Sequence, residues 1–130
     1  MKLHHIGVAV ANLDEAIVHY EKMGLRLVYR ERIESQQAEV AFMGERPWIE
    51  LVCGTHPDSA VSTFISQRGP GQHHLAFAVE NIAQELSQQE AAGARLIDRC
   101  ARPGAWGHRV AFLHPRDQGG VLIELVEEAH

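Results

Sequence analysis

Residues 4–13 read HHIGVAVANL, and residues 73–82 read HHLAFAVENI. When this alignment continues without a gap over residues 4–30, ten pairs are identical. Unrelated segments of that length would share roughly one or two. The match resumes later in each copy, at VAFM 40–43 with VAFL 110–113 and at IELV 49–52 with IELV 123–126. The sequence therefore contains an internal duplication, and each copy carries a histidine near its start and a glutamate near its end.

The composition is that of an ordinary folded domain. The chain has 130 residues, of which 45% are hydrophobic and 22% charged, so a single core can bury a large share of the unfolded surface. The net charge of -5 argues against nucleic acid or an anionic membrane as a partner. We expect one domain made of two repeats, at about residues 1–56 and 70–130, joined by a short helical linker.

Cysteine usage and the absence of long apolar runs bear on the cellular location. Cys53 and Cys100 are isolated, without a CxxC pair, so reduced thiols in a reducing compartment are the simpler interpretation. The first residues lack an apolar signal core, and no apolar run approaches the length needed to cross a bilayer. These features predict a cytoplasmic protein.

Each copy has the pattern of a βαβββ module. Asn12 and Asn81 are favoured helix N-caps, and Gly24 and Gly93 suit the left-handed position that follows a helix. Apolar runs and alternation predict strands at residues 3–10, 25–32, 38–43 and 48–53, and again at 73–79, 94–100, 108–113 and 121–127. A short helix is expected within residues 57–69.

Strand alternation places four chemically useful side chains on the same side of their strands. Successive side chains point to opposite faces, so His5 lies with Gly7 on the face that avoids the helix. The same reasoning holds for the equivalent strand of the second copy and for the late strand of each copy. The side chains predicted on this helix-free face are His5, Glu50, His74 and Glu124.

This donor set has a definite chemistry. Two imidazoles and two carboxylates suit a borderline-to-hard divalent cation. Four protein ligands of an octahedral set would leave two positions for water or substrate oxygens, whereas a closed tetrahedral zinc site would leave none. His4 and His73 also recur, but alternation turns them toward the helices, which favours a structural role. Trp48 shares the face of Glu50, where ordinary core packing is the simpler interpretation and pocket lining the alternative.

The tandem βαβββ pattern that opens with HHIGVAV and HHLAFAV resembles the vicinal oxygen chelate superfamily of glyoxalases and bleomycin-resistance proteins. Residues 102–127, RPGAWGHRVAFLHPRDQGGVLIELVE, resemble the methylmalonyl-CoA epimerase family. Trp106 departs from that family's pattern, as does the stretch 51–59. The resemblance covers essentially the whole chain and implies an α+β fold, in which an eight-stranded mixed sheet curves into a half-barrel with helices on its outer face.

The resemblance also implies an activity. It makes His5, Glu50, His74 and Glu124 the ligands of a divalent metal such as cobalt, manganese, nickel, zinc or magnesium. The implied reaction is epimerisation of methylmalonyl-CoA between its 2R and 2S forms through an enolate stabilised on that metal. Glu124 would be ligand and acid/base, and Glu50, whose position holds Glu or Gln in this family, would be ligand and candidate opposite base. An acyl-CoA substrate and a homodimer are the implied partners.

Two other functions remain open. A glyoxalase-type isomerase or lyase acting on a glutathione hemithioacetal would use the same ligand types and the same enolate chemistry. A non-catalytic resistance protein that binds small molecules on this fold would not need the ligand set. Metal analysis distinguishes the resistance protein from both enzymes, and an assay with methylglyoxal and glutathione distinguishes the glyoxalase from the epimerase.

Overall fold

The computed structural model describes residues 1–129, which form eight strands and three α-helices. The strands are β1 Lys2–Ala9, β2 Leu27–Ile33, β3 Ala38–Met43, β4 Trp48–Gly54, β5 Gly71–Ala78, β6 Arg102–Pro103, β7 Arg109–Leu113 and β8 Ile123–Glu127. The helices are α1 Leu13–Lys22, α2 Ala60–Arg68 and α3 Ile82–Ala91. The strand order β2-β3-β4-β1-β5-β8-β7-β6, with parallel β1/β4 and β5/β8 pairs, confirms the predicted α+β class and mixed eight-stranded sheet.

The chain divides into two compact units. One unit comprises His5–His73, and the other comprises Met1–His4 together with the chain from His74 onward. The prediction of a single domain made of two repeats stays a prediction. No helix among residues 1–129 is long and apolar enough to cross a membrane.

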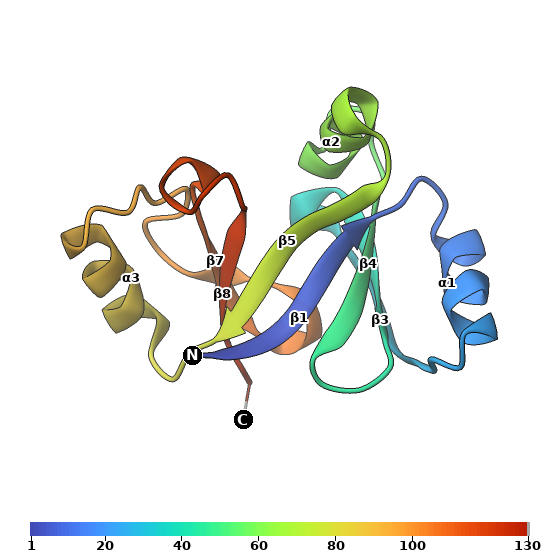
Figure 1. Ribbon diagram of the computed structural model, residues 1–130, viewed down its shortest axis with the longest axis horizontal. Coiled ribbons are helices and arrows are strands. Elements are labelled where there is room, and N and C mark those ends of the chain that lie inside the picture. The colour runs from blue at the N-terminus through green and yellow to red at the C-terminus, as the bar shows by residue number, and fades with distance from the viewer. Residues whose placement is uncertain (130) are drawn as a thin grey trace. The chain divides into compact units, whose positions relative to one another are not determined.

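In the first unit, α1 covers one face of β3 and β4 (Figure 1). The helix starts where predicted, because the Asn12 side chain accepts a hydrogen bond from the Glu15 backbone N–H at 3.0 Å. Its apolar stripe packs on the inward residues of the two strands. The buried residues of this core are Leu13, Ile17, Ala41, Met43 and Leu51. Since alternate strand residues fill this core, their neighbours point to the opposite face.

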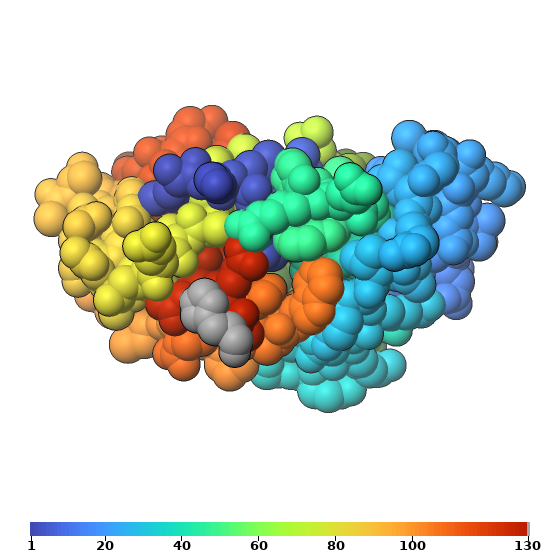
Figure 2. Space-filling view, turned by 90° about the horizontal axis from the view of Figure 1, so that it is seen from below, coloured from blue at the N-terminus to red at the C-terminus, as the bar shows by residue number. Residues whose placement is uncertain are grey.

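The second unit repeats this plan with α3 against β7 and β8. Asn81 accepts a hydrogen bond from the Gln84 N–H at 3.0 Å, which matches the cap of α1. Figure 2 shows α3, in yellow to gold, at the surface of its unit. The buried residues beneath it are Ile82, Leu86, Ala111, Leu113 and Leu125. Both units therefore keep helices on one face and leave the other face to the predicted ligands.

The predicted strand at residues 94–100 is wrong. Only Leu96 forms a bridge there, to Leu113, and the edge strand is the two-residue β6. The Asp98 side chain takes the place of a strand partner, because its Oδ2 accepts the Phe112 backbone N–H at 2.8 Å. Backbone hydrogen bonds still join the segment to β7, from Ile97 N–H to the Phe112 carbonyl at 3.0 Å and from His114 N–H to the Arg95 carbonyl at 2.8 Å. The ladder stops there because a side chain, and not the backbone, accepts the Phe112 N–H. The expected linking helix is confirmed as α2.

Candidate metal centre

In the first unit, His5 and Glu50 lie side by side on neighbouring strands. The parallel register pairs Gly7 of β1 with Glu50 of β4, so Glu50 shares the face of His5. His5 Nε2 lies 3.3 Å from Glu50 Oε1, and the residues are only 2% and 7% exposed. Gly7 contributes no side chain beside them. The first predicted imidazole–carboxylate pair is therefore formed and buried.

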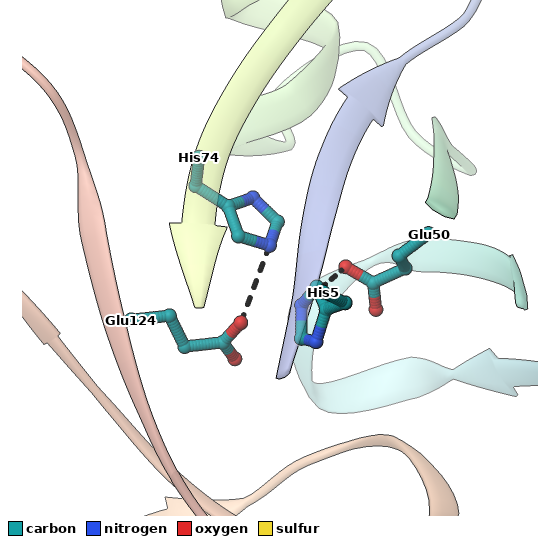
Figure 3. Close-up of side chains that lie close together, drawn as sticks. All are labelled: His5, Glu50, His74 and Glu124. Atoms are coloured by element: carbon teal, nitrogen blue, oxygen red, sulfur yellow. Dashed lines mark ion pairs between the residues drawn. The ribbon is translucent and has the colours of Figure 1, made fainter. Parts of the chain in front are cut away.

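The second unit builds an equivalent pair. The register places Ala76 of β5 beside Glu124 of β8, which turns Glu124 to the face of His74. His74 Nε2 lies 3.2 Å from Glu124 Oε1, with exposures of 5% and 7%. In Figure 3, the members of each pair point toward one another, and dashed lines mark the two ion pairs.

Each histidine packs against an aromatic side chain from the strand that is antiparallel to the glutamate-bearing strand, β3 in the first copy and β7 in the second. The Phe42 ring meets His5 edge-on, with centroids 5.4 Å apart, and Phe112 meets His74 in the same way at 5.7 Å. Phe42 lies directly opposite Glu50 in the register, and Phe112 lies directly opposite Glu124. This packing limits the rotamers of the imidazoles and directs their Nε2 atoms to the carboxylates.

The donor set fits a divalent cation. His5, Glu50, His74 and Glu124 are all buried and each offers one ligand atom, and these atoms lie within 4.8 Å of one another. Ligands on opposite sides of one cation, at bond lengths of about 2.1 Å, are separated by roughly 4 Å, so the spread is close to that of a metal site. Buried carboxylates need a compensating positive charge, which a bound cation provides. Two imidazoles and two carboxylates are ligands that such a cation accepts.

The other recurring histidines are placed elsewhere. His4 is fully buried, and its ring packs edge-on against His108 at 5.2 Å. His73 packs against Phe64 of α2 at 4.8 Å. Trp48 does share the ligand face, as predicted, and its ring lies 6.4 Å from Phe42.

A charged residue on the edge strand of each copy shares the face of the ligand pair. Glu31 of β2 lies opposite Val40, and Arg102 of β6 lies opposite Val110, at equivalent places in the two copies. The Tyr29 hydroxyl donates a hydrogen bond to Glu31 at 2.9 Å, and this carboxylate raises the pKa of Tyr29 above its usual value. The sequence did not single out Glu31, and the strand expected at 94–100 ended before Arg102, so alternation assigned Arg102 to no face of the sheet.

Comparisons with known proteins agree with this geometry. The family model described as Glyoxalase/Bleomycin resistance protein/Dioxygenase superfamily matches residues 4–112. Among curated proteins, the uncharacterized protein YqjC of Bacillus subtilis is 38% identical over 97% of this chain and 91% of its own length.

Two solved structures have nearly the same fold. Methylmalonyl-CoA epimerase from Mycobacterium tuberculosis superposes with a TM-score of 0.94 at 37% identity, covering 99% of this chain and 89% of that one. A methylmalonyl-CoA epimerase in complex with methylmalonyl-CoA and NH4+ superposes with a TM-score of 0.94 at 31% identity, covering 98% and 94% of the two chains. Both similarities extend over nearly the whole of the chain.

Proposed function

The chain belongs to the Glyoxalase/Bleomycin resistance protein/Dioxygenase superfamily, and we propose that it is a metal-dependent epimerase of methylmalonyl-CoA. The observation that carries the proposal is the buried set of two histidine–glutamate pairs on the helix-free faces of the strands. The similarity to a methylmalonyl-CoA epimerase bound to methylmalonyl-CoA supports the choice of substrate.

Epimerisation requires that a proton leave C2 of the acyl group from one face and return on the other. The resulting carbanion, which lies between a thioester and a carboxylate, is too basic to form without a fixed positive charge nearby. When bound by the four side chains, a divalent cation supplies that charge and lowers the energy of the enolate. Cobalt, manganese, nickel, zinc and magnesium are all compatible with the donor set.

The chain's own residues carry the proton. Glu124 is proposed to hold the metal and to take the C2 proton on its oxygen, and Glu50 is the candidate that returns a proton on the opposite face. The Nε2 atoms of His5 and His74 lie 3.3 and 3.2 Å from these carboxylates, a separation that adjacent ligands of one cation can have. Burial of all four side chains keeps bulk water away from the reacting carbon, so a carboxylate and not water removes and returns the proton, and it equilibrates with solvent between turnovers.

Metal reconstitution followed by parallel assays tests the proposal. The purified protein is stripped with a chelator, reloaded with each of the five divalent ions, and assayed on methylmalonyl-CoA in D2O. We expect deuterium at C2 and interconversion of the 2R and 2S forms only in loaded protein. The same samples are assayed with methylglyoxal and glutathione, and turnover of that adduct alone would establish the glyoxalase-type isomerase in place of the epimerase.

Metal analysis tests the third function, the non-catalytic binding protein. A protein that retains no metal and turns over neither substrate would be a binding module, not an enzyme. The homodimer and the cytoplasmic location stay predictions, which sedimentation and cell fractionation can test.

A further inference from the structure

Arg102 lies next to the second histidine–glutamate pair. Its guanidinium carbon sits over the Phe112 ring at 5.5 Å from the centroid, and the same ring meets His74 edge-on at 5.7 Å. The register confirms the shared face, because Arg102 pairs with Val110, two residues before Phe112, which pairs with Glu124. One aromatic ring therefore separates a cationic side chain from a proposed metal ligand.

The charge of Arg102 is held in place but only partly balanced. Its Nε lies 3.4 Å from Asp98 Oδ1, and that buried Nε has no hydrogen bond among residues 1–129. Asp98 already accepts the Phe112 N–H through its other oxygen. The Arg102 side chain is 40% exposed, so part of the guanidinium faces open space. Stacking on the ring and the carboxylate contact fix the plane of the guanidinium, which lowers the entropy lost when it binds an anion.

The first copy has the opposite charge at the equivalent place. Glu31, opposite Val40, occupies the position that Arg102 occupies opposite Val110. The ligand pairs of the two copies are alike, but the charges at the sheet edges differ in sign.

We propose that Arg102 binds the carboxylate of the acyl group and makes the site selective for carboxylate-bearing thioesters over neutral ones. A planar guanidinium matches a carboxylate through two parallel N–H···O bonds, which a lysine or a neutral side chain cannot reproduce. The inference rests on the proposed function, because the ligand is an acyl thioester. It adds the residue that recognises the carboxylate of the acyl group.

Binding measurements on the metal-loaded protein test this assignment separately from turnover. Isothermal titration compares the binding of malonyl-CoA with that of propionyl-CoA, in which a methyl group replaces the carboxylate. In the wild type, malonyl-CoA should bind more tightly. Arg102→Gln should lower the affinity for malonyl-CoA by about tenfold or more, as expected for the loss of a charge-assisted hydrogen bond. The affinity for propionyl-CoA should not change. Arg102→Lys should recover part of the affinity.

Arg99→Gln is the matched control. Arg99 lies three residues away on the same segment, but its side chain is 82% exposed and it pairs with Glu90 of α3 on the helix side. This variant should keep the wild-type preference. Thermal melts of all variants establish that they fold, and Arg102→Lys provides the measurement if Arg102→Gln does not.

Truncated ligands separate the acyl carboxylate from the phosphates of coenzyme A. With malonyl-pantetheine, which lacks the nucleotide, the effect of Arg102→Gln should persist in full. A loss confined to the CoA forms would assign Arg102 to the phosphates and overturn the proposal, as would equal losses for malonyl-CoA and propionyl-CoA or no malonyl binding by the wild type. Arg102-dependent malonyl binding without C2 exchange would refute the epimerase and leave this inference standing.

Discussion

The two copies of the module carry the same histidine–glutamate pair but surround it differently. In the first copy, Phe42 is 1% exposed and packs between His5 and Trp48. In the second, Phe112 is only half-buried and carries Arg102 on its ring. The edge strand differs as well, with seven residues in β2 and two in β6. The duplication thus preserves the ligand-bearing strands and lets the edges diverge, where charge and access to a substrate are set.

The largest expected effect is a difference in C2 exchange rate between variants of the two glutamates. Glu124→Gln should lower deuterium exchange at C2 by about 10²–10⁴-fold, because the amide keeps an oxygen ligand but cannot accept the proton. Glu50→Gln should retain more of the exchange rate, consistent with the resemblance to a family that holds Glu or Gln there. NMR in D2O measures the exchange, with metal content determined in parallel. Retained exchange in a fully metallated Glu124→Gln protein would reject its role as base.

The next prediction concerns the histidines. His5→Ala and His74→Ala should each weaken metal binding by at least about 100-fold, since even a residue that merely orients a ligand contributes 10–100-fold. Competition with a chromogenic chelator measures the affinity. His19→Ala is the control, because His19 is exposed and contacts only Tyr20 among rings of the described chain. A histidine whose loss leaves the affinity unchanged would show that its copy supplies no imidazole to the metal.

The aromatic neighbours sharpen the comparison through stability. Phe42→Ala should lower the free energy of unfolding by about 3–5 kcal/mol, as for a fully buried phenylalanine. Phe112→Ala should cost less, because this ring is partly open to solvent and less of its contact area is lost. Urea denaturation of both variants gives the difference. Equal costs would mean that the second copy is packed as tightly as the first, contrary to the exposures.

The smallest expected effect is an equal loss of stability when either helix N-cap is removed. Asn12→Ala and Asn81→Ala should each lower the free energy of unfolding by about 1 kcal/mol, because each removes one acceptor from a helix N-terminus. Asn→Asp at the same positions keeps the acceptor and should restore most of the loss. The two caps have the same 3.0 Å geometry, so a clear inequality would show that the copies differ in cooperativity and not only at their edges.

The sequence predicted the ligand-bearing strands well because their signals are local. Strand alternation determines which face His5 and Glu50 occupy. The N-caps at Asn12 and Asn81 mark where each helix begins. The registers confirm these faces, with Glu50 beside Gly7 and Glu124 beside Ala76. The proposed roles of the four residues in metal binding and proton transfer stay predictions.

The expected strand at 94–100 failed for a non-local reason. Asp98 captures the Phe112 N–H across a gap in sequence that no short pattern reveals. The same capture interrupts the ladder after the Leu96 bridge, and the edge strand resumes only at Arg102 and Pro103. Residues whose partners are side chains from another segment cannot be assigned from alternation.

The amino-acid sequence alone determined the duplication, the order of the elements and the set of four donors, because repeats and periodicity are visible in the linear sequence. Only the tertiary structure decided which charges stand beside those donors. Arg102 reaches the Phe112 ring, and Glu31 takes the equivalent place in the other copy, because strand pairing brings together residues that are far apart in sequence. Pairing at a sheet edge depends on hydrogen bonds between distant segments, and no local period records them.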